Sequence, residues 1–283
     1  MDSRSNPVDV HYSLAESPPK SGKMFKCAVI ADLNRLTHPE FSDSPKDHYQ
    51  HKGSEAQLLL DQIRDRADAI RCISKHTERQ VHIHLGLSPD RTFVSYLGLV
   101  PRGCSSKPVQ LPSANFLLAV GRIDPQKNFA RLIKSFDLLE SKDLHLVIAG
   151  KEGWRHQEVY DVVKKLSLQG RVHFLKYVPD EKLIWLYQNA AAFVCPAISE
   201  GFGLPVLEAM HYSCSVAASN GGAIPEVIGD CGILFDPLNV EEMASAIQRA
   251  LDQPKVEMAK ERTKLFTFEP TSLEVMNQFR ARI

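Results

Sequence analysis

The chain has 283 residues, 43% of them hydrophobic and 24% charged, which is enough to bury the cores of about two domains. Lysine plus arginine and aspartate plus glutamate each number 34, so a formal net charge of +0 provides no long-range field to attract nucleic acid. No segment approaches the ~20 apolar residues of a membrane span, and the first residues lack the apolar core of a signal peptide. We therefore expect a cytoplasmic protein.

The amino-terminal part of the chain alternates strand-like and helical segments at irregular spacing. Apolar runs predict strands over residues 26–31, 69–73 and 92–96, and a 3.6-residue periodicity predicts helices over 54–66 and 75–84. Together they would form a small sheet that looks like half of a doubly wound domain.

Two polar segments interrupt this pattern. Residues 36–50 carry prolines and charges and are predicted to form a surface loop. Residues 101–112, with Gly, Ser, Lys and two bounding prolines, are predicted to form an interdomain linker.

From Asn115 onward, strands and helices alternate regularly. Strands are predicted over residues 116–120, 144–149, 172–175, 192–195, 215–218 and 232–235, and helices over 128–139, 157–166, 181–189, 204–211 and 240–251. This alternation is typical of βαβ crossovers, which build a parallel sheet covered on both faces. Such sheets bind ligands at the carboxyl ends of their strands, near the point where the strand order reverses.

The six cysteines are scattered along the chain without a Cys-x-x-Cys pair. Cys27, Cys72, Cys195 and Cys214 lie in apolar runs, which is typical of small reduced core residues. We expect neither a disulfide framework nor a metal site.

The most informative segment is Glu200-Gly-Phe-Gly-Leu-Pro-Val-Leu-Glu208, which follows a predicted strand. Gly201 and Gly203 let the backbone approach a ligand closely, and Pro205 suits the first turn of a helix. A strand that ends in such a turn presents backbone amides and the positive end of a helix dipole to a phosphate. With a carboxylate on each side of the turn to accept from hydroxyl groups, the segment predicts a nucleotide-sugar site.

Three cations follow neighbouring strands. Arg122 and Lys127 flank a proline-bearing turn, and Lys151 follows the next strand. A guanidinium fork and an ammonium group would neutralise the charge that grows on a diphosphate leaving group. Taken singly, these cations also suit a solvated loop, and Glu200 and Glu208 suit the start of a helix. It is their joint occurrence after successive strands that predicts a site.

Several elements occur in a fixed order in the carboxyl part. They are Val120-Gly-Arg-Ile-Asp-Pro-Gln-Lys-Asn128, the Glu-x7-Glu pair Glu200 and Glu208, Glu208-Ala-Met210, Ser219-Asn-Gly-Gly-Ala-Ile-Pro-Glu-Val227 and Gly232-Ile-Leu-Phe-Asp-Pro237. In this order and spacing they resemble the retaining GT-B glycosyltransferases of family 4 (group 1), particularly the bacterial mannosyltransferase-like members. Residues 6–100 resemble the second half of that family's first domain less closely, with Ser74-Lys-His-Thr77 in the position of its Ser-x-x-Ser/Thr element.

The resemblance implies an α/β protein of the GT-B type, with two Rossmann-like doubly wound parallel-sheet domains, the first one truncated. Residues 1–107 would form the partial, acceptor-side domain and residues 108–255 the nucleotide-sugar-binding domain. Residues 256–283 would form a terminal helix that packs back on the first domain.

The resemblance also implies roles for individual residues. Glu200, Arg122 and Lys127 would be catalytic: the two cations hold the diphosphate, and Glu200 contacts sugar hydroxyls beside the anomeric carbon. Glu208 would accept from the two ribose hydroxyls. The remaining substrate-binding residues would be Gly121, Lys151 and, through their backbone amides, Phe202, Gly203 and Leu204. The departing phosphate itself would accept the acceptor's proton, and no metal or other cofactor is expected.

The implied function is transfer of a mannose-like hexose, with retention, from a nucleoside-diphosphate sugar to a polysaccharide or lipid-linked oligosaccharide. The acceptor would bring the enzyme into peripheral contact with a membrane, and no nucleic acid is expected to bind. Two departures from the family pattern stand against this function. An early Gly-rich loop is missing, and Ala31 precedes Asp32 where the family has a histidine. The alternative is a truncated, non-catalytic nucleotide-sugar-binding remnant, and a GT-B epimerase has little specific support.

Overall fold

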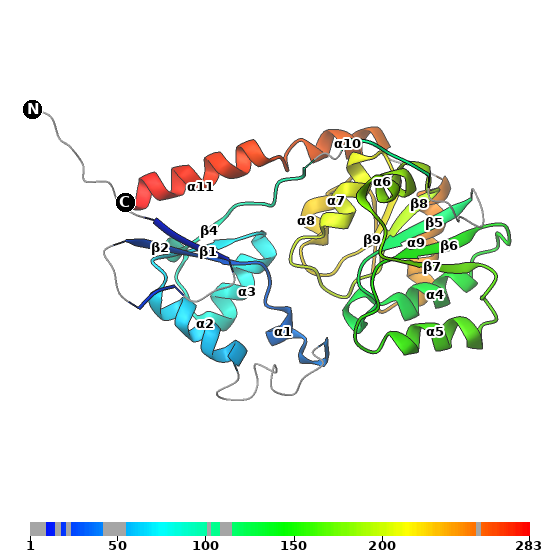
Figure 1. The fold of residues 1–283 in the computed structure, drawn as a ribbon, viewed down its shortest axis with the longest axis horizontal. Coiled ribbons are helices and arrows are strands. Elements are labelled where there is room, and N and C mark those ends of the chain that lie inside the picture. The colour runs from blue at the N-terminus through cyan, green and yellow to red at the C-terminus, as the bar shows by residue number, and fades with distance from the viewer. Residues whose placement is uncertain are drawn as a thin grey trace, which may run out of the picture. The chain divides into compact units, whose positions relative to one another are not determined.

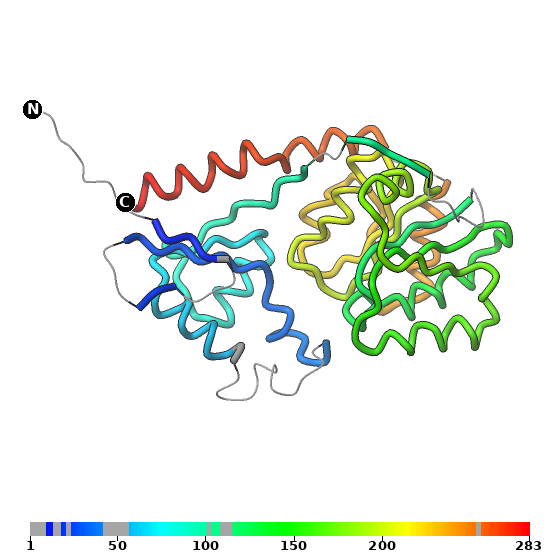
Figure 2. The backbone as a smooth tube through the Cα atoms, in the orientation of Figure 1, coloured from blue at the N-terminus to red at the C-terminus, as the bar shows by residue number. Residues whose placement is uncertain are grey.

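The computed structural model describes residues 10–14, 18–20, 24–41, 55–100, 103–107, 115–252 and 256–283. The chain divides into two compact units, Met1–Leu97 with Glu269–Ile283 and Gly98–Phe268 (Figure 1). The backbone therefore passes from one unit to the other twice, after Leu97 and after Phe268 (Figure 2). The sequence analysis placed these boundaries after residues 107 and 255. Among the described residues, no helix is both long and apolar enough to cross a bilayer.

The described part of the first unit is built on a parallel sheet in the order β1-β2-β3-β4. Its strands are β1 (Val10–Leu14), β2 (Phe25–Ile30), β3 (Ala69–Cys72) and β4 (Thr92–Val94). Helices α2 (Glu55–Arg66) and α3 (Lys75–Leu85) cover one face, and α11 (Phe268–Arg282) lies along the other (Figure 1). The sequence predicted β2, β3, β4, α2 and α3 to within two residues at each described end.

The sequence missed one strand of this unit, and one predicted loop is partly helical. Strand β1 was not predicted, because His11 and Ser13 break its apolar run and its pairing with β2 is a tertiary interaction. The predicted loop over residues 36–50 begins with two turns of helix, α1 (Asn34–Thr37) and the 3₁₀ turn Pro39–Phe41. The Asp32 carboxylate starts α1 by accepting from the Asn34 amide at 2.9 Å. Residues 42–50 lie outside the described residues.

The Ser74–Thr77 element has a structural role. The Ser74 hydroxyl oxygen accepts from the Thr77 amide at 3.0 Å and caps the start of α3. The Thr77 hydroxyl donates to the Ala31 carbonyl at 3.0 Å, so this cap also holds the segment that follows β2.

The second unit contains a parallel sheet in the order β10-β9-β8-β5-β6-β7. Its strands are β5 (Phe116–Val120), β6 (His145–Ala149), β7 (Val172–Lys176), β8 (Ala192–Cys195), β9 (Val216–Ser219) and β10 (Ile233–Phe235). All six predicted strands are confirmed to within one residue at each end. The order is that of a doubly wound sheet, and it reverses between β5 and β8.

Helices cover both faces of this sheet (Figure 1). Those packed on one face are α4 (Phe129–Asp137), α5 (His156–Lys165) and α9 (Val240–Asp252). Those on the other are α6 (Asp180–Asn189), α7 (Leu204–His211), α8 (Ile224–Ile228) and α10 (Val256–Thr263). Of the predicted linker 101–112, residues 103–107 are described, and the Ser106 amide in it donates to the Glu181 carbonyl on α6 at 3.0 Å.

The cysteines behave as their surroundings predicted. Cys27, Cys72, Cys195 and Cys214 are buried, and all six cysteines, every one of them described, are free thiols. Burial raises the pKa of the Cys214 thiol to about 12, so it stays protonated and unreactive at neutral pH.

The segments after β5 and β6 touch beyond the ends of their strands. The Gly121 amide donates to the Ala149 carbonyl at 3.0 Å, and the Ile123 amide donates to the Lys151 carbonyl at 2.9 Å. A Cβ atom at Gly150 would lie 1.8 Å from the Gly121 carbonyl oxygen. Only glycine at position 150 permits this approach.

We predict that Gly150→Ala lowers the free energy of unfolding by about 2–4 kcal/mol, because the two segments must separate to admit the methyl group. Gly170→Ala is the matched control, since a Cβ atom there meets nothing within 4 Å. Urea unfolding of both variants measures the difference. Equal stabilities of the two variants would contradict the prediction.

A second prediction concerns the imidazoles of His145 and His173, on β6 and β7. Their Nδ1 and Nε2 atoms lie 2.8 Å apart, and burial, followed by repulsion from His145, lowers the pKa of His173. The folded state therefore takes up a proton at His173 less readily than the unfolded chain. The free energy of unfolding should fall as the pH drops through about 6.5 and below.

Urea unfolding at several pH values tests this sign. His173→Gln should flatten part of the decline, and the remainder is expected partly from His211, whose pKa is lowered by burial and by Lys260. Identical pH profiles for the wild type and His173→Gln would count against the prediction.

Candidate functional site

The segments after β5 and β8 emerge at the point where the strand order reverses, and they are tied to each other. Asp124 caps the short 3₁₀ turn Pro125–Lys127 by accepting from the Lys127 amide at 3.2 Å. Asn128 closes this turn in the left-handed conformation (φ 59°), and its side-chain amide donates to the carbonyls of Pro196 (2.9 Å) and Pro237 (2.8 Å). The loop after β5 is thus fastened to the ends of two other strands.

Gln126 adds two further bonds between the same segments. Its side-chain amide donates to the Ser199 carbonyl, and its own carbonyl accepts from the Ile198 amide, each at 2.9 Å. These bonds bring the neighbours of Gln126 and Ser199 together, and Lys127 Nζ forms an ion pair with Glu200 Oε1. Two residues predicted to be catalytic are therefore in direct contact.

This ion pair is largely shielded from water. The Lys127 side chain is 20% exposed and that of Glu200 13%. Burial on its own lowers the pKa of Lys127, but the charge and hydrogen bond of Glu200 outweigh burial, and the net pKa is raised. Lys127 therefore remains an ammonium ion at neutral pH.

The loop after β9 fixes the backbone of Glu200. The Ala223 amide donates to the Glu200 carbonyl at 2.8 Å. Gly222 has a φ of +65°, and a Cβ atom there would lie 2.4 Å from the Glu200 nitrogen. At Gly221 a Cβ atom would lie 2.1 Å from the Ile198 carbonyl oxygen. The two glycines of the Ser219-Asn-Gly-Gly element are needed because backbone packs directly on backbone here.

Arg122 lies on the same loop as Lys127. Its Nε donates to Asp124 Oδ2 at 2.8 Å, and its side chain remains 66% exposed. The aliphatic part of this side chain runs over Gly153, where a Cβ atom would lie 2.8 Å from Arg122 Cγ. The guanidinium is therefore anchored at one nitrogen and reaches into solvent.

The start of α7 is a glycine-bearing turn, as the sequence predicted. Gly203 adopts a φ of +96° at the N-cap, and Leu204 and Pro205 form the first turn. The Phe202 ring is buried and contacts Phe266 edge-on, with 5.7 Å between ring centroids. The buried side chain of Phe202 thus anchors the turn.

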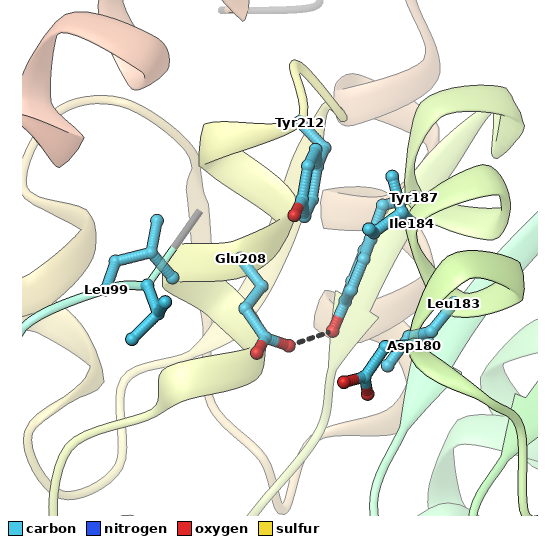
Figure 3. A pocket seen from close by; sticks show the side chains of 8 residues that line it. Leu99, Asp180, Leu183, Ile184, Tyr187, Glu208 and Tyr212 are labelled. Atoms are coloured by element: carbon cyan, nitrogen blue, oxygen red, sulfur yellow. Dashed lines mark hydrogen bonds between the residues drawn. The ribbon is translucent and has the colours of Figure 1, made fainter. Parts of the chain in front are cut away.

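Glu208 lies one turn further along α7, and its carboxylate points toward α6 (Figure 3). The Tyr187 hydroxyl donates to Glu208 Oε2 at 2.9 Å. Both side chains line a small pocket, together with Leu99, Val100, Asp180, Leu183, Ile184 and Tyr212. The structure gives Glu208 a different immediate environment from that of Glu200.

Lys151 follows β6 and is exposed. Its Nζ lies 5.5 Å from the centroid of the Tyr177 ring, which follows β7. This cation–π contact lies at the carboxyl ends of β6 and β7, on the same edge of the sheet as the loop after β5.

Sequence reasoning missed two residues that hold the predicted ones in place. Asp124 bonds both Arg122 and Lys127, and the pattern Asp-Pro at the start of a turn is a recognisable capping signal for it. No sequence pattern marks Tyr187 as a partner of Glu208, because it is one of several large residues on the buried face of α6.

In the first unit, Ala31 and Asp32 follow β2 and are exposed. The Asp32 carboxylate accepts from the Asn34 amide at the start of α1, as described above. The described residues contain no group of three or more His, Cys, Asp or Glu side chains placed to hold a metal ion.

Comparison with known proteins identifies the family. The family model described as glycosyl transferases group 1 matches residues 106–265. O-antigen chain mannosyltransferase B of Escherichia coli is 30% identical over 265 residues, covering 88% of this chain and 68% of the relative. An MMP α-(1→4)-mannosyltransferase of Mycolicibacterium hassiacum is 28% identical over 191 residues, covering 65% of this chain and 45% of the relative.

Solved structures show the same fold. Sucrose-phosphate synthase of Thermosynechococcus elongatus superposes with a TM-score of 0.73 at 21% identity, covering 93% of this chain and 69% of that one. Anabaena HepE in complex with UDP and glucose gives a TM-score of 0.72 at 17% identity, covering 91% and 72%. Both sheets of the present chain are parallel, as the GT-B fold requires. The chain belongs to the group 1 glycosyl transferases and has the GT-B fold, as the sequence motifs predicted.

Proposed function

We propose that this glycosyltransferase moves mannose, with retention of configuration, from a nucleoside-diphosphate sugar to a polysaccharide or lipid-linked oligosaccharide. The observation that carries the proposal is the shielded Lys127–Glu200 ion pair at the strand-order reversal, with Arg122 on the same loop. The relatives support mannose in particular, since O-antigen chain mannosyltransferase B and the MMP mannosyltransferase are named for that sugar.

In this proposal, the two cations bind the diphosphate and the carboxylate binds the sugar. Arg122 and Lys127 would compensate the negative charge that develops on the diphosphate as the glycosidic bond breaks. An ammonium ion has three N–H donors, so Lys127 can bind a phosphate oxygen while it keeps Glu200. Glu200 would then be held beside the sugar, where its carboxylate accepts from hydroxyl groups near the anomeric carbon.

In this proposal no protein side chain has to act as the base. The acceptor hydroxyl attacks the anomeric carbon on the face that the diphosphate leaves, and the departing phosphate oxygen takes up the hydroxyl proton. Charge compensation by Arg122 and Lys127 supports a mechanism in which no metal ion is assigned a role. We place the reaction in the cytoplasm, in line with the reduced, buried cysteines.

A donor screen tests the proposal. The purified chain is incubated with GDP-mannose, UDP-glucose and UDP-N-acetylglucosamine, each with and without short mannose-containing acceptors. Binding and nucleotide release are followed together. We expect acceptor-dependent release with GDP-mannose. Tight binding of a donor without turnover on any acceptor would instead favour the non-catalytic remnant.

We predict that Glu200→Gln, Arg122→Ala and Lys127→Ala each lower kcat by about two orders of magnitude, because each removes charge that acts on the transition state. Lys134→Ala is the matched control, since Lys134 is an exposed lysine on α4 outside the site. Steady-state kinetics with GDP-mannose measure the effect. Near-normal turnover in all three site variants would refute the assignment.

A further inference from the structure

A buried tyrosine contacts the carboxylate that the proposed function assigns to the ribose. The Tyr187 hydroxyl donates to Glu208 Oε2 at 2.9 Å, and the two side chains come from neighbouring helices, α6 and α7 (Figure 3).

The position of the Tyr187 hydroxyl is fixed by packing. The residue is 1% exposed, its ring lies 5.6 Å from the centroid of Phe193, and it stacks on Tyr212 at 6.0 Å. A ring held on both sides has little freedom left to lose when it forms a hydrogen bond. Glu208 is partly exposed and has three side-chain torsions, so its carboxylate is the flexible member of the pair.

The hydrogen bond from Tyr187 constrains the orientation of the Glu208 carboxylate. Once Oε2 accepts from Tyr187, rotation about the last side-chain torsion is restrained, and Oε1 is directed away from the tyrosine. An ionised carboxylate has about four acceptor sites, and the bond from Tyr187 takes one of them.

We propose that Tyr187 is a positioning residue, which holds Glu208 so that Oε1 faces the adjacent 2′- and 3′-hydroxyls of the donor's ribose. The inference rests on the proposed function, because it takes the donor to be a nucleotide sugar. The inference gives Tyr187 a part in the preference of the nucleotide site for ribose over sugars that lack these two hydroxyls.

The protonation state of the phenol suits this role. Burial, and next the charge of Glu208, raise the pKa of Tyr187 well above its ordinary value. The hydroxyl therefore remains a donor across the working pH range of a cytoplasmic enzyme.

The test pairs a protein change with a ligand change. Isothermal titration calorimetry compares the affinities of GDP and of 2′,3′-dideoxyguanosine 5′-diphosphate, which lacks both hydroxyls. The wild type should prefer GDP by roughly 10- to 100-fold, as expected for hydrogen bonds to a charged group. Tyr187→Phe should reduce this preference about fivefold or more, with little effect on the dideoxy ligand.

The matched control is Tyr160→Phe. The Tyr160 hydroxyl donates to Glu152 at the same distance, 2.9 Å, but on α5 and away from the pocket. This variant also loses one tyrosine–glutamate hydrogen bond, and it should keep the full preference for GDP.

A second variant tests the orientation itself and does not depend on removing Tyr187. In Glu208→Gln the tyrosine should bind the amide oxygen, which turns the NH₂ group toward the ribose, where it can only donate to the hydroxyl oxygens. The preference for GDP should then fall by about fivefold or more, because a neutral donor replaces a charged acceptor. Adding Tyr187→Phe frees the amide to turn its oxygen to the ligand, so the double variant should regain several-fold preference.

The outcomes separate the inference from the proposed function. A wild type that binds both ligands equally, or neither, contradicts the assignment of Glu208 to the ribose and so the proposed function itself. A wild type that prefers GDP, with the preference unchanged in Tyr187→Phe and no regain in the double variant, contradicts the positioning role alone. Melting temperatures show whether each variant folds. If Tyr187→Phe does not fold, Glu208→Gln still tests the orientation of the side chain at position 208.

Discussion

The contact on which the site depends is the ion pair of Lys127 and Glu200 at the reversal of the strand order. Neither residue lies on a strand, so their meeting depends on two loops being held against each other. Gln126 and Asn128 tie the loop after β5 to the loop after β8 by backbone and side-chain hydrogen bonds. Because both charges are largely shielded from water, misplacing either one would leave a poorly solvated charge.

The close approach of the loops requires glycine where there is no room for a Cβ atom, and residues that tolerate a positive φ angle elsewhere. Gly150, Gly221 and Gly222 lie where a Cβ atom would overlap the backbone of a neighbouring loop, and Asn128 adopts a left-handed conformation. The arrangement is typical of functional sites, where the fold supports a geometry that local preferences disfavour.

In the proposed function, the site uses two kinds of recognition. Lys127, Glu200 and Arg122 form a charged group, to which we assign the diphosphate and the sugar next to it. We assign the ribose diol to Glu208, which bonds Tyr187 across two helices. Charge attraction acts over a long range and is tolerant of geometry, whereas a hydrogen bond to a hydroxyl needs an acceptor in a fixed orientation. A positioning tyrosine is therefore most useful at the second contact.

The sequence by itself determined the second sheet, five of the helices that cover it, the family and the loops on which Arg122, Lys127 and Glu200 lie. It did so because apolar periodicity and glycine spacing are local properties. It did not predict strand β1, whose pairing with β2 joins segments that are separate along the chain. Nor did it predict that Lys127 pairs with Glu200, 73 residues away, or that Tyr187 on α6 holds Glu208 on α7. Only the tertiary structure decided these contacts, since a side chain's partner depends on which strands and helices become neighbours.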